Sequence, residues 1–200
     1  MNTGALRHAA LLGAYCLGFG IVLAATKELA IADIAERAME DRLASLGQVL
    51  TADIRDNNPL ASPLALRDAA GRELTVYRAM KAGRVTGVAY EIDGSGYAGA
   101  IRLMMGVAAD GRILGVRALA HRETPGLGDK IEIKKSDWIL RFAGLALDDP
   151  PAGQWKVKKD GGRFDQFAGA TITPRGVVAA VHKGLEFFEA NKTQLTEVVP

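Results

Sequence analysis

An uncharged apolar segment near the amino terminus constrains this chain more than any other feature of its sequence. Residues 9–26 read AALLGAYCLGFGIVLAAT, which is 18 consecutive residues without a charge. As an α-helix, with a rise of ~1.5 Å per residue, they extend about 27 Å, close to the thickness of the hydrocarbon core of a bilayer. Arg7 and His8 precede the segment, and Lys27 follows it directly. We therefore predict a transmembrane helix over 9–26, after a short tail over 1–8.

Two other interpretations of residues 9–26 stay open from the sequence. A cleaved signal peptide also combines a basic start with an apolar run, and small residues at 24–26 offer a weak cleavage site. A buried core helix is the second alternative, although 18 residues without a polar face are long for a domain of this size. Ala10, Ala14 and Gly18 recur every four residues. This pattern lets another membrane helix approach closely, but small residues are also common in membrane helices in general.

The whole chain has the composition of one folded domain plus this segment. Its 200 residues are 48% hydrophobic and 24% charged, which is normal for a globular protein. The 25 basic and 23 acidic residues nearly balance, unlike the basic surplus of a nucleic-acid-binding domain. The single cysteine, Cys16, cannot form an internal disulfide, and the three histidines are not spaced as metal ligands. We therefore expect no metal and no nucleic-acid partner.

The residue pattern after the apolar segment predicts an α+β domain, in which an antiparallel sheet has flanking helices. Residues 27–50 are predicted to be helical, as part of a helical connector over 27–58 that Asn57, Asn58 and Pro59 end, and residues 59–200 are predicted as the domain. The elements predicted in the domain are strands over 73–79, 85–92, 101–107 and 113–119, a short helix over 134–143, a strand over 154–158, and a long final helix with Thr173 as N-cap and Pro174 as first helical residue.

A glycine-proline loop follows the fourth of these strands. Residues 121–130 read HRETPGLGDK. Pro125 restricts the backbone, while Gly126 and Gly128 lack a Cβ atom and so let a flat ligand approach. Glu123 and Thr124 add an acceptor and a hydroxyl. Taken alone, the segment is more typical of an ordinary loop than of a binding site.

A second motif leads into the final helix. Residues 165–175 read DQFAGATITPR, so that small residues precede the hydroxyl of Thr171. Free N–H groups at a helix amino terminus favour anions such as phosphate, and Arg175 adds a positive charge. The motif predicts a phosphate-bearing ligand beside Thr171. An ordinary capped helix start after a tight turn is the alternative.

Taken together, the two motifs resemble the FMN-binding domain of membrane redox complexes. That domain occurs in the G subunit of the Rnf electron-transport complex and in the C subunit of the sodium-translocating NADH:quinone oxidoreductase. The resemblance implies FMN attached covalently, through a phosphoester to the hydroxyl of Thr171, in a segment of the pattern Asp-x-x-[Ser/Thr]-Gly-Ala-Thr. Ala168 departs from this pattern and offers no hydroxyl. The chain length and the run FDQFAGATITPR at 164–175 are more similar to the Rnf subunit.

The resemblance also implies the residues that surround the cofactor. Asp165 is expected to be recognised by the flavin transferase that attaches FMN, and a turn-capping aspartate is its alternative interpretation. The residues expected around the ring, the ribityl chain or the phosphate are Gly169, Ala170, Glu123, Thr124, Gly126, Leu127, Gly128, Lys130 and Thr173.

Four further residues have two interpretations each. His121 suits a proton partner of the flavin, but a structural histidine is the more usual case. Tyr97 suits either a neighbour of the flavin ring or the surface of the sheet. Trp138 and Trp155 are expected in the core rather than beside the flavin.

The resemblance implies an electron carrier rather than a complete enzyme. The chain lacks a nicotinamide fingerprint and iron–sulfur cysteines, so ferredoxin and NAD are expected to react at other membrane and peripheral subunits. The charges flanking residues 9–26 do not decide orientation. The resemblance implies a single-pass protein of the cytoplasmic (inner) membrane with its soluble domain in the periplasm. The alternatives are the equivalent quinone-reductase subunit and a non-redox envelope scaffold.

Overall fold

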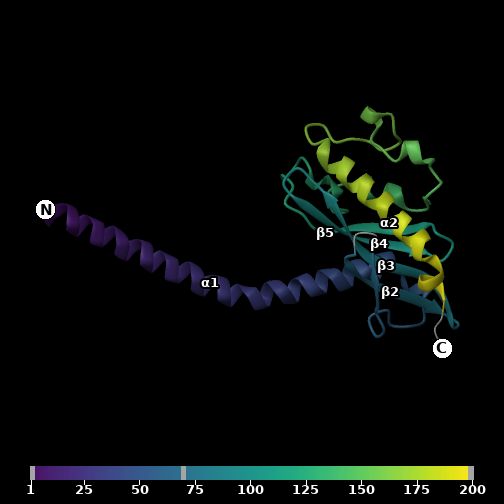
Figure 1. Cartoon of the computed structure of the whole chain (residues 1–200), viewed down its shortest axis with the longest axis horizontal. Coiled ribbons are helices and arrows are strands. Elements are labelled where there is room, and N and C mark those ends of the chain that lie inside the picture. Colours follow the sequence, from purple (N-terminus) through teal and green to yellow (C-terminus); the bar gives the residue numbers. More distant parts are fainter. Residues whose placement is uncertain (1–2, 69–70, 198–200) are drawn as a thin grey trace. The chain divides into compact units, whose positions relative to one another are not determined.

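A computed structural model describes residues 3–68 and 71–197 of the chain (Figure 1). Its first helix, α1 (Thr3–Val49), is continuous over 47 residues, so the predicted anchor and the helical part of the connector belong to one helix. Within it, Leu6–Ile31 has a mean hydropathy of 1.9 and could span a membrane. Large side chains such as Leu17 and Phe19 are exposed. This exposure contradicts a buried core helix and is what lipid contact requires.

The helix ends at Val49, one residue before the end of the stretch 27–50 that the sequence predicts as helical, and well before Asn57. The chain divides between Asp41 and Arg42 into two compact units, and the last turns of α1 belong to the second. Val49, the last residue of α1, and Leu50, which follows it, are buried in the domain. Asn57 does not end the helix. Its side chain instead accepts from the N–H of Met80 at 2.8 Å and donates to the carbonyl of Arg78 at 3.0 Å.

The sheet is an antiparallel meander in the order β1-β2-β3-β4-β5. Its strands are β1 (Leu64–Arg67), β2 (Glu73–Lys81), β3 (Arg84–Ser95), β4 (Ala100–Ala108) and β5 (Ile113–Ala120). Four of the five predicted strands, those over 73–79, 85–92, 101–107 and 113–119, are confirmed. The sequence analysis missed β1, because its four residues are too few to show a period of two.

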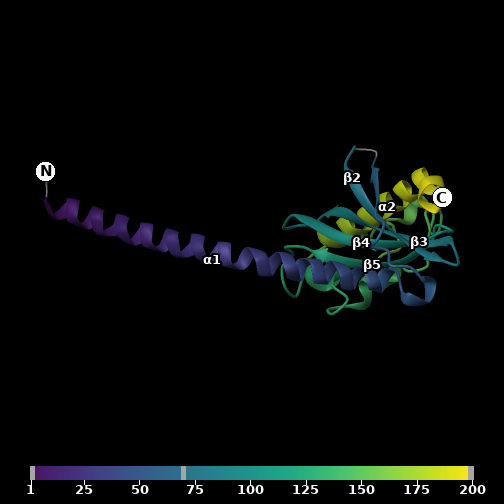
Figure 2. The same cartoon turned by 90° about the horizontal axis from the view of Figure 1, so that it is seen from below.

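Each face of the sheet is covered by a different helix. α2 (Ile172–Thr196) lies over β3 and β4 (Figure 1 and Figure 2), where Tyr90 donates to the carbonyl of Gly184 at 2.7 Å. On the opposite face, the end of α1 packs on Ala89 and Met104. Successive side chains of a strand point to opposite faces of the sheet, so neighbouring residues of β3 and β4 pack in two separate apolar layers.

A glycine brings the start of α2 against the end of β3. A Cβ atom at Gly176 would overlap the carbonyl oxygen of Ser95, and one at Gly94 would lie 3.0 Å from the carbonyl oxygen of Gly176. The close approach therefore depends on the missing side chains. It places the amino terminus of α2 next to the loop that follows β3.

The segment between β5 and α2 is irregular, and two predictions for it are wrong. The region predicted as a helix over 134–143 is a 3-10 helix over Asp137–Phe142. The region predicted as a strand over 154–158 has two 3-10 turns, Ala152–Gln154 and Lys158–Asp160, and only an isolated bridge at Val157. Packing of aromatic rings, rather than a hydrogen-bonded ladder, holds this segment. The rings belong to Trp138, Phe142, Trp155, Phe164 and Phe167.

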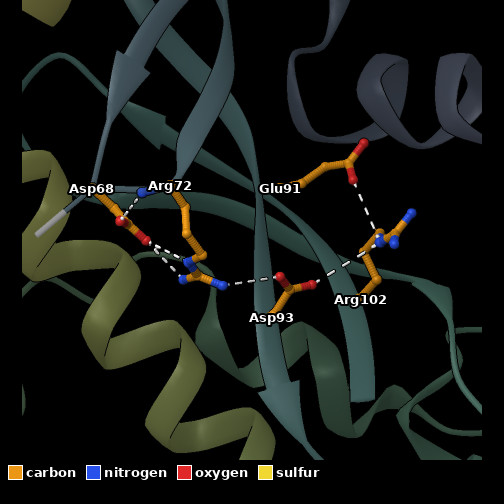
Figure 3. A network of polar contacts seen from close by, with 5 residues as sticks. All are labelled: Asp68, Arg72, Glu91, Asp93 and Arg102. Carbon is orange, nitrogen blue, oxygen red and sulfur yellow. Dashed lines mark hydrogen bonds and ion pairs between the residues drawn. The ribbon is translucent and has the colours of Figure 1, made fainter. Parts of the chain in front are cut away.

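Charged side chains link the turn between β1 and β2 to the neighbouring strands (Figure 3). Arg72 pairs with Asp68 at 2.8 Å and with Asp93 at 3.3 Å. Arg102 of β4 lies 3.7 Å from Glu91 and 4.0 Å from Asp93. Both arginines are largely exposed, and solvent-exposed pairs of this kind contribute about 0–1 kcal/mol each. The network therefore adds little to the stability that the two apolar layers provide.

Candidate functional site

Three segments that are distant in sequence meet in one cleft of about 290 Å³. They are the loop after β3 at 96–99, the loop after β5 at 123–128, and the residues that lead into α2 at 169–172. Both predicted motifs therefore converge on one site. The cleft is lined by Tyr97, Glu123, Thr124, Leu127, Gly128, Gly169, Ala170, Thr171 and Ile172.

A buried carboxylate lies where these segments meet. The side chain of Glu123 accepts from the N–H of Ala98 at 3.0 Å and from the N–H of Tyr97 at 3.3 Å. It also accepts a hydrogen bond from the hydroxyl of Thr173. Glu123 is 6% exposed and Thr173 is fully buried. One carboxylate thus connects the loop after β5 with the loop after β3 and with the first turn of α2.

The surroundings of Glu123 favour its ionised form. Burial by itself would raise its pKa. Hydrogen bonds from Thr173 and from the N–H groups of Ala98 and Tyr97 outweigh burial and lower the pKa of Glu123 below its ordinary value. The group is therefore a carboxylate at neutral pH, with three hydrogen-bond donors around it.

Two glycines make room for this carboxylate. A Cβ atom at Gly96 would overlap Oε1 of Glu123. A Cβ atom at Gly128 would lie 2.8 Å from Oε2 of Glu123 and 2.9 Å from the hydroxyl of Thr173. Any larger residue at either position would push the loops apart. Gly128, predicted as a point of close approach to a ligand, also permits close approach between protein segments.

The loop after β5 is a tight turn with its own hydrogen bonds. The carbonyl of Thr124 accepts from the N–H groups of Leu127 and Gly128, both at 3.1 Å. Gly126 has a φ of 79°, which favours glycine, and its N–H donates to Asp129 at 2.8 Å. The turn leaves the Leu127 side chain at the cleft and 41% exposed. The loop therefore offers an apolar, open surface to a ligand.

The start of α2 differs from the prediction. The helix begins at Ile172 with Thr171 in the N-cap position, so Thr173 and Pro174 belong to its first turn. The predicted capping role of Thr173 is wrong, because its hydroxyl bonds to Glu123 instead. Thr171 has helical backbone angles and makes no side-chain cap hydrogen bond. Thr171 therefore lines the cleft with a hydroxyl that does not cap the helix.

Four of the predicted site residues do not line the cleft in the described part of the chain: Gly126, Lys130, Asp165 and Thr173. Lys130 lies in the 3-10 turn Asp129–Ile131. Asp165 forms ion pairs with Arg141 and, at 2.5 Å, with Lys158, and the Lys158 hydrogen bond contributes most to lowering its pKa. The other seven predicted residues line the cleft, with Thr171 at the amino terminus of α2.

Arg175 is also engaged away from the cleft. Its guanidinium makes two hydrogen bonds of 2.6 Å to Asp160, and these lower the pKa of that carboxyl. The positive charge expected near the second motif is therefore paired with a carboxylate. The backbone N–H groups at the start of α2 are donors that an anion beside Thr171 can use.

The residues with two interpretations are now placed. His121 has both ring nitrogens engaged, because Nδ1 accepts from the N–H of Glu123 at 3.2 Å and Nε2 lies 3.1 Å from Glu132. This geometry favours the structural interpretation. Tyr97 lies at the cleft and is 75% exposed, so it is not a residue of the sheet surface. Trp138 and Trp155 are buried in the core, as predicted.

The sequence analysis missed one lining residue, Ile172, and left Tyr97 open. The sequence feature that could have indicated the loop at 96–99 is its pair of glycines, Gly96 and Gly99. Gly99 has a φ of 135°, and its carbonyl accepts from the N–H of Gly96 at 2.7 Å, which closes the turn. Nothing in the local sequence of Ile172 indicates a binding residue, because an isoleucine at a helix start is usually part of the core.

A larger cavity, of about 490 Å³, lies between α2 and strand β3. Its apolar floor includes Ile92 and Phe187, and Asp93 and Lys183 are among its charged lining residues. It contains neither of the two motifs. The smaller cleft is therefore the candidate site, because the predicted residues gather there.

Comparison with known proteins shows which family the chain resembles. Residues 96–186 match the FMN-binding domain family. The chain is 52% identical over 190 residues to the G subunit of the ion-translocating oxidoreductase complex of Cereibacter sphaeroides (strain ATCC 17029 / ATH 2.4.9), and the match covers 95% of this chain and 87% of that protein. It is 48% identical over 198 residues to the G subunit of the same complex in Pseudomonas aeruginosa (strain UCBPP-PA14), with 95% and 91% covered.

A solved structure shows the same fold. The crystal structure of Shewanella oneidensis NqrC matches with a TM-score of 0.51 and covers 72% of each chain. The sequences are 24% identical. The antiparallel sheet with its flanking helices is thus a fold already seen experimentally.

Proposed function

We propose that this chain, which belongs to the family of G subunits of ion-translocating oxidoreductase complexes, carries FMN covalently on Thr171. Membership of the family follows from 52% identity over 95% of the chain, and an FMN-binding domain covers residues 96–186. The chain is accordingly a flavoprotein subunit of an ion-translocating oxidoreductase. The observation that supports Thr171 as the attachment point is that this residue lines the cleft and that its hydroxyl makes no cap hydrogen bond.

The residues of the cleft suit FMN. The first N–H groups of α2 have no acceptor within the helix and are available to phosphate oxygens. A Cβ atom at Gly169 would lie 3.4 Å from Leu127, so the bare glycine leaves space beside that side chain for a flat ring. Leu127 and Ile172 provide apolar contacts, being 41% and 46% exposed. When bound, FMN supplies electron transfer in one- or two-electron steps, and a phosphoester prevents its loss in any oxidation state.

The chain relays electrons within its complex in this proposal. The complex transfers electrons between ferredoxin and NAD and couples this transfer to ion movement. α1 anchors the protein by a single pass in the cytoplasmic membrane, and the flavin domain lies in the periplasm. The partners are the other subunits of the complex and a flavin transferase that recognises the segment around Asp165. The alternative, a quinone-reductase subunit, is less favoured because NqrC is only 24% identical.

The attachment site is tested by denaturing electrophoresis of the full chain, produced together with its flavin transferase. Wild type is expected to show a fluorescent flavin band that survives denaturation, and Thr171→Ala is expected to lose it completely. Thr171→Ser is the matched control, because it keeps the hydroxyl and is expected to retain the band. Covalent flavin on Thr171→Ala would contradict the proposal.

The role in the complex is tested with the purified assembly. A complex that contains Thr171→Ala is expected to assemble but to lose electron transfer between ferredoxin and NAD. Digestion of the flavin domain by protease in spheroplasts, but not in inside-out vesicles, is the expected result for a periplasmic domain. The opposite digestion pattern would place the domain on the cytoplasmic side.

A further inference from the structure

We infer that Glu123 is a positioning residue, which holds Thr171 in the orientation that allows FMN attachment. The inference rests on the proposed function and goes beyond it, because it assigns assembly of the site to a side chain that does not itself carry the cofactor. Glu123 acts through the hydroxyl of Thr173, which it binds directly. Thr173 lies two residues after Thr171 in the chain, in the first turn of α2.

The hydrogen bonds of Glu123 cross large distances in sequence. Its carboxylate binds the N–H groups of Tyr97 and Ala98, which are 26 and 25 residues away, and the hydroxyl of Thr173, which is 50 residues away. All three bonds converge on two oxygen atoms. Without these hydrogen bonds, the loop after β3, the loop after β5 and the start of α2 would lose their common partner.

The same oxygens have little capacity left for a ligand. Glu123 is 6% exposed. Its two oxygens lie so close to Gly96 and Gly128 that a Cβ atom at either glycine would clash with one of them. A carboxylate that accepts three hydrogen bonds inside the protein differs from one that is offered to a flavin. The geometry therefore assigns Glu123 to the construction of the cleft.

Both carboxylate oxygens of Glu123 are needed as acceptors, as well as the shape of its side chain. Oε1 accepts from Ala98, and Oε2 accepts from both Tyr97 and Thr173. Glutamine has one oxygen and one amide nitrogen at these positions, so its amide would face a backbone N–H in either orientation. The hydroxyl of Thr173 can rotate to accept, but a backbone N–H cannot. Glu123→Gln keeps the volume and breaks at least one bond of the set.

A second buried acid provides a matched control. Asp129 is also 6% exposed and lies six positions further along the chain. It accepts from the N–H of Gly126 at 2.8 Å and lies 3.8 Å from Lys135, so its contacts stay within residues 126–135. Asp129→Asn removes an equally buried charge, and its remaining oxygen can still accept from Gly126.

The experiment measures how fast the flavin transferase labels the full chain in detergent at varied chain concentration. Glu123→Gln is expected to lower kcat for labelling by about 10- to 100-fold, because small misplacements of a reacting group have effects of this size. KM is expected to change little, since Asp165 and its surroundings are unaltered. Asp129→Asn is expected to label at close to the wild-type rate.

Thr173 provides a second pair of variants that does not depend on the folding of Glu123→Gln. Thr173→Val removes the hydroxyl at nearly constant volume and is expected to lower kcat in the same way. Thr173→Ser restores the hydroxyl and is expected to recover most of the rate. Recovery by serine supports the hydrogen bond to Glu123 as the cause.

Three results would overturn the inference. They are wild-type labelling of Glu123→Gln, an equal loss of rate in Asp129→Asn, and equal labelling of Thr173→Val and Thr173→Ser. The first shows that the carboxylate is dispensable, and the second that any buried charge in this region matters. Failure of the proposed function gives a different result from failure of this inference. If FMN is not attached to Thr171, the variant Thr171→Ala still accepts flavin.

Discussion

Glu123 links folding of the flavin domain to pH at the scale of a single residue. Its pKa is lowered in the folded state, chiefly by the hydrogen bond from Thr173, which together with two backbone N–H groups outweighs burial. A lowered pKa stabilises the fold above the pKa of the unfolded chain, about 4.3 for glutamate. This stabilisation is lost as the pH falls toward the lower pKa of the folded state.

The pH dependence of stability therefore provides a prediction for Glu123→Gln. Wild type is expected to be more stable than the variant at neutral pH, and this difference is expected to shrink below about pH 4.3. The measurement is the thermal unfolding midpoint of both full chains in detergent, between neutral pH and acid. A difference that stays constant over this range would show that the charge of Glu123 does not contribute.

At the residue scale, the sequence could predict which residue types gather at the site, but not what each one does. Seven of the predicted residues line the cleft. The role of Thr173 was not predictable, because it depends on a partner 50 residues away. The same is true of Arg175, which the sequence places beside a ligand and the structure pairs with Asp160. Long-range side-chain contacts have no local sequence pattern.

At the scale of elements, the long irregular segment between β5 and α2 is held by aromatic packing. Phe142 is fully buried. Its ring lies 4.8 Å from that of Phe164, 5.3 Å from that of Trp138 and 6.4 Å from that of Trp155. These rings bring the second motif next to the sheet without forming a strand.

Phe142→Ala is expected to destabilise the domain by about 3–5 kcal/mol, because it removes a large buried side chain and leaves a cavity. Urea unfolding of the full chain, followed by tryptophan fluorescence, measures the change. Leu140→Ala is the control in the same 3-10 helix. Leu140 is 39% exposed, so a loss of about 1 kcal/mol or less is expected. Equal losses in the two variants would contradict a structural role for the aromatic cluster.

Among the elements, the regular ones were predictable and the irregular ones were not. Strands β2 to β5 are runs of mainly apolar residues that turn residues such as Gly83 and Gly111 separate, and this pattern is local. The segment 154–158 has a similar composition but no neighbouring strand to pair with beyond one isolated bridge. Whether an extended run becomes a strand depends on a partner, which only the tertiary structure supplies.

At the scale of the whole molecule, the chain combines a helix suited to lipid with a domain suited to water. Leu6–Ile31 has the length and composition of a membrane span, and its large apolar side chains are exposed. The domain from Arg42 onward has its own two apolar layers, one on each face of the sheet. The domain therefore does not need the apolar segment to complete its core.

Membrane attachment is tested by washing membranes with alkaline carbonate. The full chain is expected to stay in the membrane pellet, and a chain that starts at Arg42 is expected to be released as a folded soluble protein. The intact mass of the membrane-bound protein is expected to include residues 9–26. A mass that lacks this segment would favour the signal-peptide interpretation instead.

The sequence by itself determined the apolar helix, the antiparallel strands and the two motifs, because hydropathy, periodicity and turn residues act over short stretches of chain. The tertiary structure alone decided that α2 starts at Ile172, that the hydroxyl of Thr171 does not cap this helix, and that Glu123 joins three segments. These features arise from atoms that meet only after folding. Their hydrogen bonds and close contacts depend on geometry between distant residues, which no local pattern records.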